Sequence, residues 1–190
     1  MSSLNEKFSE LRVRLKQGRD LTSASFEPIY YLVFDPSDML DVKRELPAWR
    51  AALTNDGWNI HIFSVAEAIE EIFQSARLRK IWLTQDKKAP LAWQKTNQSF
   101  ANYLEKNKPL QEQLKAKLET LAGQAHSLLL VTDIEALHPY MRIGVLENEV
   151  FGKFKTPSVI FYPGKRTGKT RLKFLGFYPE DGNYRSVHIG

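Results

Sequence analysis

The sequence predicts a three-layer α/β domain, with a mostly parallel central sheet flanked by helices and a C-terminal antiparallel β-hairpin. Three observations predict this fold. Several short segments, 28–34 among them, are apolar at nearly every position, which is typical of parallel strands covered on both faces. Segments with helical spacing of apolar residues separate these strands, as in βαβ units. The stretch 170–177 alternates apolar and cationic residues, which is typical of a hairpin strand.

The chain begins with a predicted amphipathic helix over 1–18. Ser3 and Glu6 have the spacing of a capping box, in which the side chain of each residue bonds the backbone N–H group of the other. Apolar residues then recur three and four positions apart until Gly18, where we expect the helix to end. A buried strand follows at 28–34.

The next elements are a helix and a strand that leads into another helix. Apolar spacing predicts a helix over 39–53, but Pro47 disfavours helical conformation of the residue before it, so we expect two helical pieces. The alternation over 58–63 predicts a strand. Ser64 and Glu67 form a second capping box, so this strand passes directly into a helix.

The second half of the chain adds a helical region and two more strands. Residues 77–125 are predominantly helical in pattern and too long for a single crossover, so we expect a helical cap on one side of the sheet. Apolar runs predict buried strands at 127–132 and 157–162. Between them, Pro139 is expected to begin a helix that extends to residue 150.

Length and composition limit the class of protein. At 190 residues, 43% of them hydrophobic, the chain suits one domain over 1–190 that buries its own core. The absence of cysteine excludes disulfides, thiolate metal sites and a cysteine nucleophile. No apolar run approaches the ~20 residues of a membrane span, and the N-terminus has no signal-peptide pattern. We therefore expect a cytoplasmic protein without a membrane partner.

The segment from Gly164 to Thr170 superficially matches a phosphate-binding loop. A functional loop needs four residues between its glycines and must open a helix, whereas three residues separate Gly164 from Gly168 and a strand pattern follows. We therefore predict a turn at Pro163-Gly164 and a β-hairpin. The expected fold is P-loop-NTPase-like or Rossmann-like without a functional P-loop. Asp133, which follows an apolar strand, is then expected to cap or turn the chain instead of binding Mg²⁺.

The sequence contains no recognisable set of catalytic, cofactor-binding or metal-binding residues. Its four histidines are scattered, and neither a metal-binding histidine pair nor a nucleophile elbow of the GxSxG type occurs. Neighbouring carboxylates such as Glu70 and Glu71 belong to the predicted solvent face of a helix. We therefore expect a protein that is not an enzyme and that holds no cofactor.

The formal net charge of +5 equals the charge of one short basic patch. Five cations fall within nine residues, with no acidic residue among them: Lys165, Arg166, Lys169, Arg171 and Lys173. Such a patch suits contact with nucleic-acid phosphates or with an acidic protein surface. It also suits protection of an exposed strand edge against pairing with another chain. The sequence leaves these three roles open.

Motifs spread over nearly the whole chain resemble those of one protein family. In the C-terminal third they are the run P-x-V-x-F-Y-P-G over 157–164, Gly168, L-x-x-x-x-G over 172–176 and D-x-N-Y-R over 181–185. Upstream, the motifs are Phe34-Asp35-Pro36, Leu46-Pro47 and a block from Leu130 to Arg142. By these motifs the chain resembles the BrxB family of the bacteriophage-exclusion (BREX) phage-defence systems.

The resemblance implies a small non-enzymatic component of a multi-protein anti-phage system. Members of the family act beside a PglZ-type phosphatase-fold protein, a large ATPase (BrxC) and an adenine DNA methyltransferase (PglX). The resemblance therefore implies an adaptor that binds the PglZ protein and helps to assemble the defence and methylation complex, with BrxC, PglX and DNA as further candidate partners. Two alternatives remain: a DNA-binding subunit that uses the basic hairpin at 165–173, and a degenerate nucleotide-binding protein.

Ligands of open α/β sheets usually bind at the carboxyl ends of the strands, so an interaction rim is expected there. The candidate rim residues are Asp35, Arg142, Tyr162, Pro163, Gly164, Asn183, Tyr184 and Arg185. A structural role is the alternative for each of them. Pro163-Gly164 would fix a turn and Tyr184 would be buried. Arg142 or Arg185 would then pair with Asp35 or Asp133 to hold the rim together.

Overall fold

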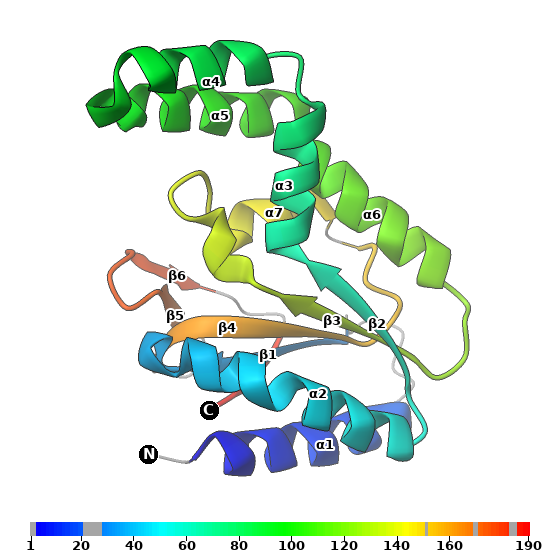
Figure 1. Cartoon of the computed structure of the whole chain (residues 1–190). Coiled ribbons are helices and arrows are strands. Elements are labelled where there is room, and N and C mark those ends of the chain that lie inside the picture. Colours follow the sequence, from blue (N-terminus) through cyan, green and yellow to red (C-terminus); the bar gives the residue numbers. More distant parts are fainter. Residues whose placement is uncertain (1–2, 21–27, 151, 169–170, 183–185) are drawn as a thin grey trace.

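A computed structural model of the chain describes residues 3–20, 28–150, 152–168, 171–182 and 186–190 (Figure 1). The centre of the fold is a parallel sheet with the strand order β2-β3-β4-β1-β7. The bounds of these strands are β1 Ile29–Phe34, β2 Asn59–Ser64, β3 Ser127–Thr132, β4 Ser158–Thr167 and β7 Val187–Ile189. The end of β4 pairs antiparallel with β5 (Arg171–Phe174), which pairs with β6 (Glu180–Gly182). The predicted parallel sheet and C-terminal hairpin are confirmed.

The first strand of the chain lies inside the sheet, between β4 and β7, and β2 lies at an edge. In the Rossmann order the first strand is instead a neighbour of the second. The chain therefore crosses from the middle of the sheet to its edge between β1 and β2, and the intervening helix α2 covers the sheet along the way (Figure 1).

Helices cover both faces of the sheet (Figure 1). Helices α1 and α2 pack on one face against alternate strand residues such as Leu32 and Leu130. Helices α3, α6 and α7 pack on the opposite face against the intervening residues, such as Val33 and Val131. Every residue of β1 and β3 is buried, which explains their nearly unbroken apolar sequences. The helix bounds are α1 Leu4–Asp20, α2 Met39–Asn55, α3 Val65–Ser75, α6 Pro109–Leu121 and α7 Ile143–Val150.

A pair of helices projects from the body of the molecule beyond α3 (Figure 1). It consists of α4 (Arg79–Lys88), the short 3-10 helix η2 (Pro90–Ala92) and α5 (Trp93–Asn107), and we call residues 79–107 the arm. The predicted cap over 77–125 therefore separates into two parts. The arm extends outward, whereas α6 packs in the helical layer of the body because its leucines are buried there.

Two helices run past residues at which we expected an end or a break. Helix α1 continues beyond Gly18, where the absence of a side chain makes room for the Tyr30 hydroxyl. Helix α2 is continuous through Pro47, although a proline inside a helix costs about 3 kcal/mol. Val42 and Trp49, on either side of the proline, are both buried in the same core, and this burial holds the two halves on one axis.

Two predicted boundaries in the second half of the chain are also wrong. The backbone N–H groups of Tyr140 and Met141 both donate to the Leu137 carbonyl in a tight turn, so α7 begins at Ile143 and not at Pro139. This turn follows the 3-10 helix η3 (Ile134–Leu137). Strand β4 continues through Pro163-Gly164, so the hairpin turns beyond Thr167.

Both predicted capping-box serines begin helices at the expected positions, but only the first box has both of its hydrogen bonds. The Ser3 N–H donates to Glu6 Oε2 at 2.8 Å, and the Glu6 N–H donates to Ser3 Oγ at 3.3 Å. At α3, Ser64 Oγ accepts from the Glu67 N–H at 3.3 Å. Within the described part of the chain, no helix combines the length and the apolar character that crossing a membrane requires.

Candidate functional site

The carboxyl ends of the central strands meet along one edge of the sheet, which we call the carboxyl edge. Asp35 follows β1, Ser64 ends β2 and Asp133 follows β3. The chain leaves β1 toward the face covered by α2, and it leaves β3 toward the opposite face through η3. Ligands of open α/β sheets bind where successive connections diverge in this way, so this edge is the first place to look for a site.

Lys43 of α2 connects that helix to the carboxyl edge. Its Nζ lies 2.9 Å from Asp133 Oδ1 and 2.8 Å from Glu135 Oε1. The second oxygen of Asp133 accepts hydrogen bonds from Ser64 Oγ and Thr132 Oγ1, both at 2.8 Å. We call these five residues the Lys43 cluster. The cluster joins α2, the β2–α3 junction and the end of β3 at one point.

The Lys43 cluster favours the charged forms of its lysine and of Asp133. Partial burial opposes ionisation of Asp133, whose side chain is 23% exposed, but the hydrogen bonds from Lys43, Thr132 and Ser64 outweigh this effect. The pKa of Asp133 is therefore lowered from its ordinary value. The hydrogen bond to Glu135 and, to a smaller extent, that to Asp133 raise the pKa of Lys43. Since the Asp133 oxygens already accept three hydrogen bonds, the arrangement suits holding these elements together.

Asp35 stabilises the turn after β1. Its Oδ1 accepts from the Ser37 N–H at 3.0 Å and from Ser37 Oγ at 2.8 Å, and these hydrogen bonds lower the pKa of its carboxyl. Lys165 Nζ, from the β4–β5 hairpin, lies 3.8 Å from Asp35 Oδ2. Lysines therefore pair with both carboxylates for which an arginine partner was the structural alternative, Lys165 with Asp35 and Lys43 with Asp133.

The space between α2 and the carboxyl edge is small. The cavity there has a volume of about 20 Å³, which is room for about one water molecule. Apolar side chains of β1, α2 and β4 form most of its wall, and Lys43, Asp133 and Glu135 form the polar side. A bound nucleotide would need α2 to move and the Lys43 cluster to open.

Three of the predicted rim residues are buried at the root of the hairpin. Tyr162 is 1% exposed, and its ring contacts the rings of Tyr31 and Phe174, at centroid distances of 5.5 and 5.6 Å. Pro163 and Gly164 are buried beside it. Their position favours a packing role. Whether the predicted rim contacts a partner stays a prediction.

Replacing Gly164 with alanine is expected to lower the free energy of unfolding by at least about 1 kcal/mol. A Cβ atom at this position would collide with the Lys173 backbone carbonyl and with the Tyr162 ring, and a backbone carbonyl cannot move aside cheaply. Urea unfolding of the two proteins measures the difference. Gly123→Ala is the comparison variant. It introduces backbone strain, because Gly123 is left-handed with a φ of 80°, but no collision, because its surroundings are open. Equal stability of Gly164→Ala and the wild type would contradict the crowding.

Arg142 belongs to a second group of side chains, located between η3 and the end of β5. Its guanidinium carbon lies 5.7 Å from the centre of the Tyr178 ring. The Tyr178 hydroxyl lies 2.5 Å from His138 Nδ1, and the exposed Phe177 ring contacts both His138 and Tyr178. Sequence reasoning found Arg142 as a rim residue and included His138 in the same motif block, but it missed Phe177 and Tyr178, because no spacing rule joins residues so far apart in the chain.

The basic hairpin presents several of its cations on one side. Lys165 and Lys173 are directly opposite each other in the antiparallel pair of β4 and β5, and Thr167 is opposite Arg171. Since alternate residues of a strand share a face, Lys165, Lys173 and Arg171 lie on the same face of the ribbon. Arg171 Nη1 is 3.5 Å from Glu180 Oε2. Lys169 and the predicted rim residues Asn183, Tyr184 and Arg185 lie outside the described residues.

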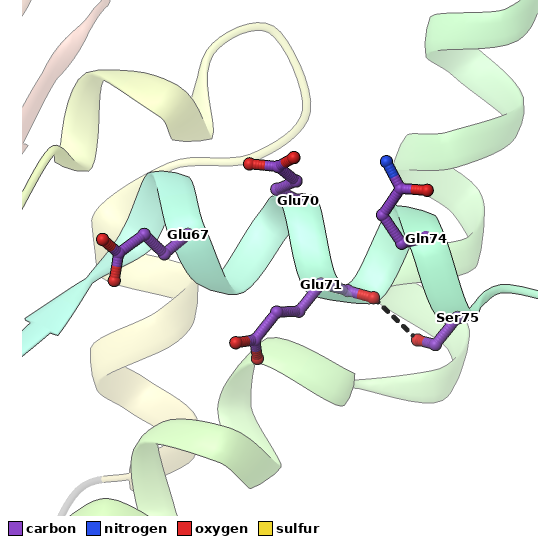
Figure 2. Close-up of a pocket in the computed structure, with 5 residues that line it drawn as sticks. All are labelled: Glu67, Glu70, Glu71, Gln74 and Ser75. Carbon is purple, nitrogen blue, oxygen red and sulfur yellow. Dashed lines mark hydrogen bonds between the residues drawn. The ribbon is translucent and has the colours of Figure 1, made fainter.

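A wide, shallow depression of about 570 Å³ lies on α3 and is lined by Glu67, Glu70, Glu71, Gln74 and Ser75, as Figure 2 shows. These side chains all come from one helix, and Glu70 and Glu71 lie on its solvent face, as predicted. Ser75 Oγ donates back to the Glu71 carbonyl at 2.8 Å. Among the described residues, no cluster of histidines and carboxylates has the arrangement needed to hold a metal ion.

Comparison with known families identifies what this chain is similar to. The family model "BREX protein BrxB" matches residues 62–189. This match includes the second half of β2, all of β3 and β4, the arm and the C-terminal hairpin, and it begins after α2. Searches of the curated proteins and of the solved structures gave no match. The matched region contains the block from Leu130 to Arg142 and the motifs of the C-terminal third, whereas the motifs at 34–36 and 46–47 lie before it. Since the match covers well over half of the chain, the chain belongs to the BrxB family of BREX phage-defence proteins.

Proposed function

We propose that this BrxB-family protein is a non-enzymatic, cytoplasmic adaptor of its BREX system that binds the PglZ-type protein and helps to assemble the defence complex. The observation that supports the proposal best is the lack of space for a substrate at the carboxyl edge. The usual ligand position of the fold contains the Lys43 cluster and a cavity of only about 20 Å³. A protein with this arrangement is better suited to act through its outer surface than through a bound substrate.

Co-purification tests the adaptor function. The tagged chain is co-expressed with the PglZ-type protein alone, and separately with BrxC and with PglX, and each eluate is analysed by size-exclusion chromatography. We expect a stable complex with the PglZ-type protein. Retention of BrxC or PglX in place of that protein would contradict the proposed partner, and the absence of a complex with any component would contradict the adaptor function.

The basic hairpin supports a second candidate function, direct DNA binding. Like charges directly opposite each other destabilise an antiparallel pair, and Lys165 faces Lys173 in this way with Arg171 on the same face. The ion pairs of Lys165 with Asp35 and of Arg171 with Glu180 are long and exposed, so they neutralise the face only weakly. A row of phosphates would offset the repulsion between these cations.

The triple variant Lys165→Gln, Arg171→Gln, Lys173→Gln tests DNA binding by the hairpin. If the hairpin binds phosphates, the affinity for duplex DNA falls, and the slope of log K against log salt concentration decreases by about 0.9 for each phosphate that is no longer neutralised. Fluorescence anisotropy at several salt concentrations measures both quantities. Lys153→Gln, Lys155→Gln, with two exposed lysines outside the hairpin, is the control. An unchanged affinity and slope in the triple variant would exclude this function for the hairpin.

A further inference from the structure

The tip of the arm combines exposed apolar side chains with lysines. Leu91 is 91% exposed and Trp93 is 53% exposed, although large apolar side chains are usually buried in a folded protein. Lys87, Lys88 and Lys95 are exposed around them. We call these five residues the arm tip. In Figure 1 the turn between α4 and α5 lies at the end of the arm that points away from α3.

The whole arm region is cationic. Residues 79–107 contain two carboxylates, Asp86 and Glu105, against six cations: Arg79, Lys80, Lys87, Lys88, Lys95 and Lys106. Asp86 is itself occupied, since its Oδ1 accepts a hydrogen bond from Thr96 Oγ1 at 2.5 Å. The six cations and two carboxylates give the arm a net charge of +4, close to the +5 of the hairpin patch, but spread over two helices, where a search for short basic runs does not find it.

The arm is held rigidly, which makes its tip suitable for docking. Trp82 at the base of the arm is 2% exposed and donates from Nε1 to Ser99 Oγ at 2.9 Å, joining α4 to α5. Its ring stacks on Phe73 of α3 and meets the ring of Phe100 edge to face. The Phe100 ring also contacts that of Tyr140 in the body, at a centroid distance of 4.9 Å. A surface that is ordered before binding loses little conformational entropy when a partner binds.

We propose that the arm tip is a docking surface for another protein, whose complementary site is an apolar pocket surrounded by carboxylates. Tryptophan is enriched among the residues that dominate binding energy at protein interfaces, and such residues sit in apolar pockets within a polar rim. The lysines around Leu91 and Trp93 match an acidic rim and accelerate association with it. A nucleic acid suits this tip less well, because phosphates gain nothing from the aliphatic Leu91. The inference rests on the proposed adaptor function and assigns it a contact surface.

Two double variants and two matched controls test the docking surface. Leu91→Ser, Trp93→Ser removes the apolar centre, and Lys87→Glu, Lys88→Glu reverses the charge of the rim. Val13→Ser on α1 changes an exposed apolar residue elsewhere, and Lys153→Glu, Lys155→Glu reverses two exposed lysines before β4. Each protein is co-expressed with the components of its BREX system, and binding to the retained component is measured as affinity and association rate at two salt concentrations. Thermal unfolding checks that each variant is folded.

We expect Leu91→Ser, Trp93→Ser to weaken the complex at least tenfold and Lys87→Glu, Lys88→Glu to slow association most strongly at low salt, with both controls unchanged. Wild-type affinity in both arm-tip variants would overturn the docking surface and leave the adaptor function intact. If the wild type retained no component, both proposals would fall. If the arm-tip variants lost DNA binding or self-association while they kept their affinity for the component, the class of partner proposed here would be wrong.

Discussion

Trp82→Ala is expected to destabilise the arm by about 3–5 kcal/mol, the range for truncating a buried tryptophan. Trp82 is central to the aromatic cluster at the base of the arm, where its ring touches Phe73, Phe100 and Tyr103. Alanine would leave a cavity among these rings and would remove the hydrogen bond to Ser99. Since the strands have their own core contacts, we expect the destabilisation to concentrate in α4 and α5.

Hydrogen exchange resolved by peptide measures this local effect. In Trp82→Ala, amides of α4 and α5 should exchange much faster, whereas amides of β1, β3 and β4 should keep their protection. Trp93→Ala is the control of the same chemical kind, because Trp93 is half-exposed at the arm tip; its stability should change by less than about 0.5 kcal/mol. Unchanged exchange in the arm of Trp82→Ala would show that the aromatic cluster does not hold the arm.

Asp133→Asn is expected to lower the free energy of unfolding at pH 7 by about 1.5–3 kcal/mol, the range for hydrogen bonds to a charged group. The backbone of Asp133 is left-handed, with a φ of 58°, and asparagine tolerates this conformation, so the substitution removes charge without adding backbone strain. Urea unfolding measures the decrease. A double-mutant cycle with Lys43→Met separates the ion pair from the hydroxyl contacts. Equal effects of Asp133→Asn with and without Lys43 would contradict their coupling.

The contribution of Asp133 should depend on pH. Its pKa is lower in the folded protein than the value of about 3.9 in the unfolded chain. The unfolded state therefore takes up the proton first as the pH falls, and the stabilisation is complete above pH ~4 and is lost as the pH decreases through the folded pKa. The stability difference between wild type and Asp133→Asn should shrink over that interval. A difference that stayed the same from neutral pH down through the folded pKa would contradict this account.

The hairpin shows what a local sequence signal predicts correctly and what it does not. Proline followed by glycine is a strong turn signal, and it predicts a turn at Pro163-Gly164. In the structure Gly164 instead faces Phe174 inside the β4–β5 pair, and its lack of a side chain makes room for the Tyr162 ring and the Lys173 carbonyl. The need for a glycine was therefore readable from the sequence. Its cause, the close approach of a different strand, was not.

In the candidate site, too, some features follow from the sequence and others depend on the tertiary structure. The positions of Asp35 and Asp133 after apolar strands follow from the sequence, because polar residues end buried strands. Lys43 has no distinguishing local pattern and becomes part of the site only because α2 crosses the sheet above the end of β3. The arm tip was missed for a similar reason. Lys87 and Lys88 end α4 whereas Lys95 lies in α5, so the three lysines form one tip only because α4 and α5 fold back on each other.

The sequence by itself determined the α/β class, the strands β1 and β3, the serine N-caps of α1 and α3 and the family, because each depends on contacts within a few residues or on motifs that keep their order. Tertiary structure alone decided the strand order, the continuity of α2 through Pro47, the Lys43 cluster and the separation of the arm from α6. The physical reason is that these features depend on burial and ion pairing between distant segments. Such energies exceed local preferences, and they exist only once the chain has folded.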